Sequence, residues 1–162
     1  MHRKWVVNAS PLIILAKIGK ISLLYDLCEE MIIPSGVKHE IDQGPKDDPA
    51  RIWIQSHGMK WVRDVGPISP VISAWDLGRG ETEVLNWAYG HPGCETILDD
   101  RAAKDCALSV SIKVRGTISV VLLAKREGKL HRVTHILDQL PKAGFRIQAK
   151  ILATAKELAG ED

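Results

Sequence analysis

The sequence predicts an α/β protein with a central parallel sheet covered by helices on both faces. Short apolar runs at residues 5–7, 30–34 and 95–98 have the composition of buried strands. Helix-forming segments separate these runs, and such alternation along a chain is typical of βαβ units. A length of 162 residues is enough to bury a substantial core. We therefore expect residues 1–162 to form a single domain.

The other expected elements follow from capping and breaking signals. After the first strand, Ser10 fits a helix N-cap and Pro11 fits the first helical position, and Gly19 ends the helix. Gly128 ends a later apolar helix. Gly78 to Glu81 is predicted to be a turn that leads into a helix. The further expected helices are at 21–27, 35–41, 51–57, 82–89, 101–108, 117–127, 133–140 and 147–158, the further strands at 60–65 and 113–116, and the loops at 43–49 and 66–70.

Composition narrows the classes of function. A net charge of +2 and a pI near 8.4 are less basic than a protein that coats nucleic acid, so any nucleic-acid contact would come from a local patch. Three widely spaced cysteines indicate free thiols in a reducing cytosol. The apolar run at 11–16 is too short to span a bilayer. We expect a cytoplasmic protein with no membrane partner.

Two adjacent carboxylates, Asp99 and Asp100, stand between the strand at 95–98 and the helix at 101–108. Ligands in open α/β sheets bind outside the carboxyl ends of the strands, so the pair is a candidate metal or phosphate site. Aspartate is also a preferred N-cap, and one of the two is expected to cap the helix. These residues alone leave both interpretations open.

Three more polar residues lie where a strand ends or a helix begins. They are Asn8 after the first strand, Glu40 on the helix that starts near Ser35, and Glu81 at the start of the helix at 82–89. Mg²⁺ and Mn²⁺ prefer hard oxygen ligands, and neighbouring acids repel one another unless a cation lies among them. Spacing along the chain does not show whether these side chains meet.

A set of sequence blocks also carries a family resemblance. The blocks lie, in order, at residues 6–13, 32–41, 78–83, 97–103, 114–117 and 122–128. Their order and spacing resemble the PIN-domain superfamily, and within it a family of PIN-like nucleic-acid-binding proteins. The resemblance implies a three-layer α/β/α sandwich with a central parallel sheet and an acid cluster that binds Mg²⁺ or Mn²⁺. Active members are ribonucleases, and many are toxins with a cognate antitoxin.

The resemblance also implies roles for individual residues. By position, the metal ligands fall on Asn8, Glu40, Glu81 and Asp100, and the catalytic acids on Glu40, Glu81, Asp99 and Asp100, with Asp99 as the partner of Asp100 or as a cap. Asn8 departs from the family pattern, which usually has aspartate there. A neutral amide oxygen is a weaker ligand, so this change puts catalysis in question while leaving the fold unaffected.

The function that the resemblance implies is a divalent-metal-dependent endoribonuclease, a phosphodiester hydrolase of the toxin–antitoxin type. Expected partners are RNA, a cognate antitoxin protein and a second copy of the chain. The alternative is a non-catalytic module that binds RNA or a protein. Residues close in sequence to the acids could contact phosphates, although surface solvation explains each basic one equally well. These candidates for nucleic-acid binding are Ser10, Arg79, Arg101 and Lys104, with Arg115 also considered.

Other polar and aromatic residues are given structural interpretations. Glu83 lies two residues from Glu81, on another helix face, and is expected to be solvated. His131 and His135 have a spacing that can bind zinc, but no third ligand is evident, so a solvated face is expected. Four tryptophans are expected to serve core packing or a partner interface more than base stacking. They are Trp53, Trp61, Trp75 and Trp87.

Overall fold

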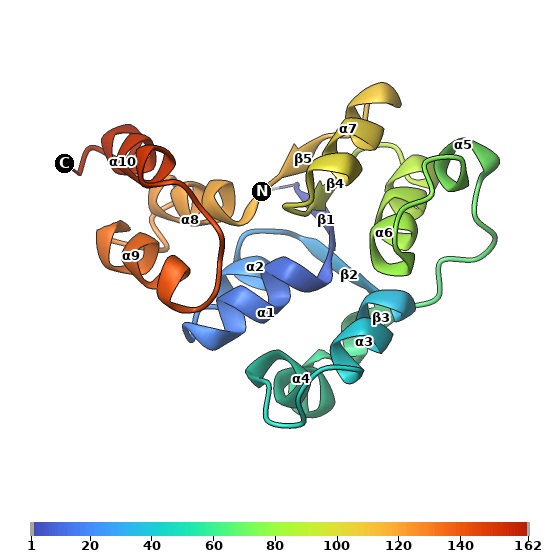
Figure 1. Cartoon of the computed structure of the whole chain (residues 1–162), viewed down its shortest axis with the longest axis horizontal. Coiled ribbons are helices and arrows are strands. Elements are labelled where there is room, and N and C mark those ends of the chain that lie inside the picture. Colours follow the sequence, from blue (N-terminus) through green and yellow to red (C-terminus); the bar gives the residue numbers. More distant parts are fainter. Residues whose placement is uncertain (1, 162) are drawn as a thin grey trace.

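The computed structural model describes residues 2–161, and within them five strands form a parallel sheet in the order β3-β2-β1-β4-β5 (Figure 1). The strands are β1 (Lys4–Val7), β2 (Glu30–Pro34), β3 (Val62–Arg63), β4 (Cys94–Ile97) and β5 (Val114–Arg115). They lie where the apolar runs predict them, although β3 and β5 are shorter than expected. The predicted parallel α/β fold is confirmed.

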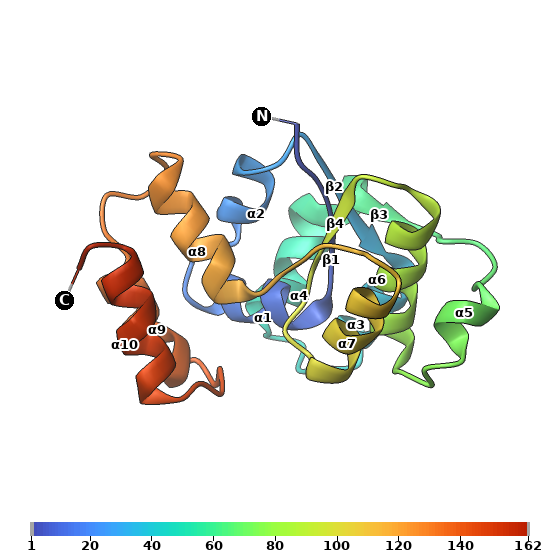
Figure 2. The ribbon, with the colours of Figure 1, turned by 90° about the horizontal axis from the view of Figure 1, so that it is seen from above.

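Helices cover both faces of this sheet. The α-helices are α1 (Ala9–Lys17), α2 (Ser22–Asp26), α3 (Ser35–Asp42), α4 (Pro49–Trp53), α5 (Pro70–Ser73), α6 (Arg79–Gly90), α7 (Arg101–Ser109), α8 (Thr117–Arg126), α9 (Thr134–Lys142) and α10 (Ala149–Leu158). Figure 2 shows α2 and α8 on one side of the strands and α6 and α7 on the other. The three layers match the expected α/β/α sandwich. No helix within residues 2–161 has the length and apolar character needed to cross a membrane.

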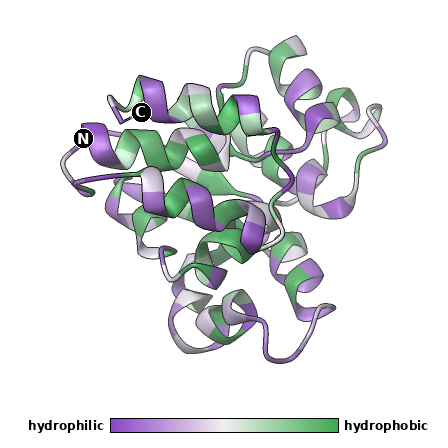
Figure 3. Cartoon of the chain, turned by 60° about the vertical axis from the view of Figure 1, so that its left-hand side comes forward, coloured by the Kyte–Doolittle hydropathy of each residue, from purple (hydrophilic) through white to green (hydrophobic). Residues whose placement is uncertain are grey.

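The core is built around β1, the middle strand. Trp5, Val6 and Val7 are fully buried, as a strand covered on both faces requires. The indole of Trp5 still finds a polar partner, because its Nε1 donates to Glu95 Oε1 on the neighbouring strand at 2.9 Å. Coloured by hydropathy, the elements in the middle of the molecule are mostly hydrophobic, whereas several peripheral loops are hydrophilic (Figure 3).

The region after α4 differs from the regular helix expected at 51–57. The chain passes from α4 into a π-helical turn, η1 (Ile54–Gly58), and a 3₁₀ turn, η2 (Met59–Trp61). Trp53 and Trp61 stack on each other with ring centroids 5.5 Å apart, and both stack on Tyr25. Stacking of two rings eight residues apart requires the chain to wind back on itself, which an uninterrupted helix would not do. These two tryptophans therefore serve packing, whereas Trp75 is 39% exposed.

Helices α9 and α10 pack on each other and on α8, beside the sheet (Figure 1). Glu161, which follows α10, holds this hairpin at its open end. Its carboxylate accepts hydrogen bonds from the N–H groups of Val133 and Thr134 at 2.9 and 3.1 Å, and from Lys125 Nζ at 2.6 Å. A negative charge at the start of α9 is favourable for the helix dipole. The hairpin is thereby fixed relative to α8.

Candidate metal and nucleic-acid site

The predicted metal-binding and catalytic residues all line one cleft of about 510 Å³ at the carboxyl edge of the sheet. They are Asn8, Glu40, Glu81, Asp99 and Asp100. Strand β1 lies between β2 and β4, so the strand order reverses direction at β1, where ligands of open α/β sheets bind. Asn8 N–H donates to Ile97 O at 2.9 Å, which brings the ends of β1 and β4 side by side. Glu40 comes from α3 and Glu81 from α6. The acids are distant in sequence, and the sheet brings them together.

Asn8 has an unusual environment in this cleft. It is 2% exposed, and its Oδ1 is buried with no hydrogen-bond partner among the described residues. A buried polar atom without a partner costs about 1–3 kcal/mol, so this oxygen has a strong preference for a donor or a cation. Asn8 is also the N-cap of α1, although its side chain makes no cap hydrogen bond. The expected N-cap, Ser10, is instead the second residue of the helix and lines the cleft.

Gly80 allows Asn8 and Glu40 to approach α6 closely. A Cβ atom at Gly80 would lie 3.2 Å from Asn8 Oδ1 and 3.6 Å from Glu40 Oε1. The prediction that residues 78–81 form a turn before the helix is wrong. Helix α6 already begins at Arg79, so Gly80 lies inside its first turn. A larger residue at this position would occupy the space that the two polar side chains share.

Glu40 and Glu81 are electrostatically coupled. Burial, and secondarily the negative charge of Glu81, raise the pKa of Glu40 above its usual value. Glu81 Oε2 lies back over the start of α6, 2.7 Å from where a Cβ at Gly78 would stand. The fold therefore disfavours the ionised form of Glu40, and a cation between the two carboxylates would reverse this effect.

The expectation that one of the two aspartates caps the helix that follows them is confirmed, and the other aspartate contacts the start of a different helix. Asp100 Oδ2 accepts from Ala103 N–H at 2.9 Å and caps its own helix, α7. Asp99 caps α8: its Oδ1 accepts from Thr117 N–H at 2.8 Å and its Oδ2 from Thr117 Oγ1 at 2.6 Å. Both oxygens of Asp99 are thus engaged, whereas Asp100 uses only one in the hydrogen bonds described. This difference favours Asp100 as the residue free to contact a ligand.

Glu83 was expected to be solvated, and this expectation is wrong. It is 8% exposed, and its carboxylate accepts from Gly36 N–H and from Arg79 Nε, both at 2.8 Å. The first contact satisfies a free N–H at the start of α3, the helix that carries Glu40. Glu83 therefore joins α6 to α3 and fixes the position of the site. In the sequence, only the i, i+4 spacing of Arg79 and Glu83 indicates that Glu83 has an ion-pair partner.

The basic residues that lie around the acids in the structure differ from those that the sequence predicts. Of the four nucleic-acid candidates, only Ser10 lines the cleft, and Arg79 forms its ion pair with Glu83. Arg101 and Lys104 lie outside the cleft lining, and Lys104 belongs to a neighbouring cavity beside β5. The cations that do line the cleft are Lys17 and Arg146, which the sequence interpretation missed. The position of Lys17 could have been predicted from the sequence, because Lys17 lies two helical turns after Ser10 and therefore on the same face of α1.

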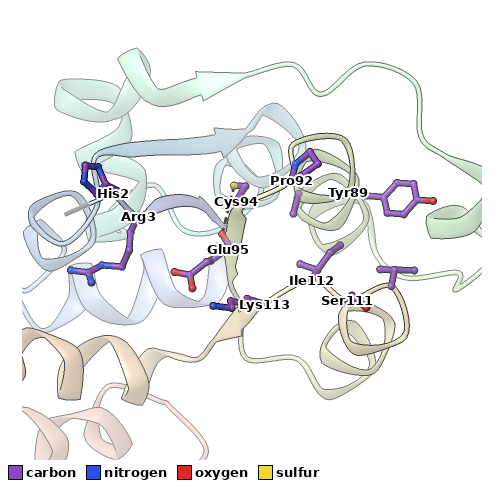
Figure 4. Close-up of a pocket in the computed structure, with 12 residues that line it drawn as sticks. His2, Arg3, Tyr89, Pro92, Cys94, Glu95, Ser111, Ile112 and Lys113 are labelled. Atoms are coloured by element: carbon purple, nitrogen blue, oxygen red, sulfur yellow. Dashed lines mark hydrogen bonds between the residues drawn. The ribbon is translucent and has the colours of Figure 1, made fainter.

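A second cavity, of about 470 Å³, lies at the opposite, amino ends of β1 and β4 (Figure 4). Its polar lining includes Glu95, whose pKa is held below its usual value by hydrogen bonds from Trp5 and Arg115 although burial alone would raise it. Burial raises the pKa of the Cys94 thiol to about 12, so this cysteine stays protonated and is a poor nucleophile or metal ligand. Nothing in this cavity matches the convergence of oxygen donors at the other end of the strands.

Other candidate metal-binding groups are absent from the described residues. His131 and His135 are exposed, as expected, and the three cysteines are free and buried. No three His, Cys, Asp or Glu side chains within residues 2–161 form a ready-made metal-binding group. The donors in the cleft nevertheless fit a hard divalent cation, because they are oxygens and one of them is buried without a partner.

The fold and the cleft together define a class: doubly wound α/β proteins with an acidic cleft at the topological switch point. A family model described as PIN domain matches residues 4–161 of the chain. The chain belongs to this family, whose members have a nuclease-like fold, act in general on nucleic acid and generally use divalent metals. No curated protein matches the chain.

Proposed function

We propose that the protein is a divalent-metal-dependent ribonuclease and that the cleft is its active site. The observation that carries this proposal is Asn8 Oδ1, which is buried with no hydrogen-bond partner among residues 2–161 and shares its space with Glu40 Oε1. An oxygen with no donor beside ionisable carboxylates is an arrangement that a cation stabilises. Family membership supports the nucleic-acid substrate.

Asn8, Glu40, Glu81 and Asp100 are the residues that would hold Mg²⁺ or Mn²⁺. Mg²⁺ keeps several of its waters and takes only a few protein oxygens, which suits donors that form no complete cage. When bound, such an ion lowers the pKa of water and offsets charge on a phosphodiester. Burial and the charge of Glu81 raise the pKa of Glu40 in the metal-free site, so a cation held there would favour the ionised form of this carboxylate. Asp99 keeps the end of β4 attached to the start of α8 through Thr117.

The proposal is tested by incubating the pure protein with labelled RNA in Mn²⁺, in Mg²⁺ and in chelator. We expect cleavage that requires metal and is lost in Glu40→Gln, which removes one charge at nearly constant volume. Cleavage that persists in Glu40→Gln would come from a contaminating nuclease and would contradict the proposal. In parallel, metal should raise the melting temperature, since it binds only the folded state, and Glu81→Gln should remove most of that shift.

A non-catalytic module that binds RNA or a protein partner is the second candidate. It is favoured by the neutral side chain of Asn8 and by the engagement of both aspartates as caps. Fewer free negative charges mean weaker cation binding and weaker activation of water. Metal binding without cleavage of any RNA tried would support this candidate over the enzyme.

The resemblance further supports a role as the toxin half of a toxin–antitoxin pair in the cytoplasm. Such a toxin would be held inactive by its antitoxin until released. Co-expression with the product of a neighbouring small reading frame, followed by size-exclusion chromatography, tests this role. A stable complex that suppresses RNA cleavage is the expected result, and independent elution of the two proteins would contradict it.

A further inference from the structure

We propose that Lys17 and Arg146 bind the phosphates that flank the scissile position of a single-stranded RNA, so that the loop between α9 and α10 is part of the substrate site. This inference rests on the proposed function and extends it to the substrate's backbone. It assigns a binding role to a segment that lies more than forty residues beyond Asp100 in the sequence.

The loop between α9 and α10 forms one wall of the same cleft as the acids, through Ala143, Gly144, Phe145 and Arg146. Its shape is fixed by hydrogen bonds: Gly144 N–H donates to Pro141 O at 3.1 Å and Phe145 N–H to Leu140 O at 3.0 Å. This pattern is a Schellman motif, which needs a left-handed residue, and Gly144 has φ of +98°. The motif packs Phe145 against the core, and Arg146 follows it at the cleft.

Another part of the wall is a face of α1. Ser10, Ile13 and Lys17 recur at helical spacing and all line the cleft. Seven residues of α-helix rise about 10 Å, so Lys17 lies two turns along α1 from Ser10, whereas Asn8, which shares its space with Glu40, lies at the start of this helix. Lys17 is therefore placed to meet a phosphate next to the scissile one and not the scissile phosphate itself.

The positive charges of Lys17 and Arg146 would offset the repulsion between the acids of the cleft and an RNA backbone. Four carboxylates line the cleft and would repel a polyanion, whereas Lys17 and Arg146 are exposed and have no ion-pair partner within residues 2–161. Arg79 differs, because its charge is already offset by Glu83. Free cations around an acid cluster allow a phosphate chain to enter and be positioned.

The surface between the cations and the acids is partly apolar. Ile13, Ile14 and Phe145 line it, and Ile14 is almost fully buried. An apolar surface beside a row of charges suits a single strand, whose unpaired bases can pack against side chains. A double helix keeps its base faces stacked inside and would present its sugar-phosphate backbone and groove edges to this surface, not unpaired bases.

The test measures binding of a labelled single-stranded RNA by fluorescence anisotropy, in chelator, with all variants in the Glu40→Gln background to prevent cleavage. Lys17→Gln and Arg146→Gln should each weaken binding by about fivefold and lower the salt slope of log K by about 0.7. The matched controls are Lys20→Gln after α1 and Lys150→Gln on α10, which remove the same charge outside the cleft lining. Melting temperatures show whether each variant folds normally.

The inference is overturned if the cleft variants bind like the controls, if the parent binds no RNA, or if a duplex competes as well as the single strand. Its failure can be distinguished from that of the proposed function. Metal-dependent cleavage with kcat/KM unchanged in Lys17→Gln and Arg146→Gln would overturn the inference alone. Binding that depends on both residues, in a protein that never cleaves RNA, would support the inference and overturn the ribonuclease proposal.

Discussion

Asn8 Oδ1 and Glu40 Oε1 converge on the same small space beside Gly80, 3.2 and 3.6 Å from the point where a Cβ at Gly80 would stand. The amide oxygen is neutral and buried, with no hydrogen-bond partner in the described part of the chain, and the other oxygen belongs to a carboxyl group whose pKa is raised. Substitutions at Gly80 and at Asn8 should therefore change how the protein responds to a divalent cation.

Gly80→Ala should weaken the metal response. The added methyl group must displace Asn8 or Glu40, while alanine in a helix gains up to about 1 kcal/mol over glycine. We therefore expect unchanged or higher stability in chelator together with a smaller metal-induced rise in melting temperature. Gly90→Ala, at the other end of α6, is the matched control, because its Cβ would meet no atom within 4 Å. Equal metal responses of the two variants would contradict the proposed cation position.

Asn8→Asp restores the family's usual carboxylate and is nearly isosteric. It should tighten binding of Mg²⁺ or Mn²⁺, because carboxylate oxygens are preferred ligands for these ions. It should also destabilise the metal-free protein, since another anion then faces Glu40. We expect a lower melting temperature in chelator, a larger metal-induced shift, and RNA cleavage equal to or above that of the parent. An unchanged metal response and unchanged cleavage would place Asn8 outside the site.

Asp100→Asn should separate the two roles of this residue. The amide oxygen can still accept from Ala103 N–H, so the cap and the stability are expected to be largely kept. Metal binding should weaken, because one negative charge is lost. Asp99→Ala is the contrasting variant: it removes the cap on Thr117 and should cost about 1–2 kcal/mol of unfolding free energy. A metal-induced shift in melting temperature that is lost in Asp99→Ala but kept in Asp100→Asn would reverse the assignment.

Glu40→Gln should stabilise the metal-free protein at neutral pH. The folded-state pKa of Glu40 lies above its unfolded value, so its ionisation opposes folding above that pKa and does not do so below the unfolded value. In chelator the variant should therefore melt higher than the parent at pH 7, and the difference should shrink as the pH falls. Glu157→Gln, on an exposed part of α10, controls for net charge. A variant that is no more stable than the parent at pH 7 would argue against a strained Glu40.

Glu161→Gln should destabilise the α9–α10 hairpin by several degrees in melting temperature. Hydrogen bonds from Lys125 and Thr134 hold the pKa of Glu161 well below its usual range, so its stabilising effect is present above the unfolded pKa and lost as pH falls through the folded one. Parent and variant should differ at pH 7 and converge in acid. Hydrogen exchange should also increase in residues 143–146, because the hairpin carries that wall of the cleft. A change no larger than in Glu157→Gln would contradict this role.

Much of the fold follows from the sequence alone. The burial of β1 on both faces is visible as an unbroken apolar run, and helix ends such as Gly128 follow from the local conformational freedom of glycine. Asn8, Glu81, Asp99 and Asp100 could be selected as site candidates because each lies where a strand ends or a helix begins, whereas Glu40 lies in the last turn of α3 and was assigned through the family resemblance. These signals act over a few residues, which is the range over which propensity and periodicity operate.

Other features were decided only by the tertiary structure. The contact of Asp99 with Thr117 spans 18 residues and depends on β5 pairing beside β4. The burial of Glu83 depends on α6 packing against α3, and Arg146 lines the same cleft as the acids because the hairpin packs on α8. A side chain's burial and partners are set by the elements that pack around it, and these are distant in sequence. For this reason the sequence determined which acids to consider, while the packing decided which oxygens remain free and which cations face them.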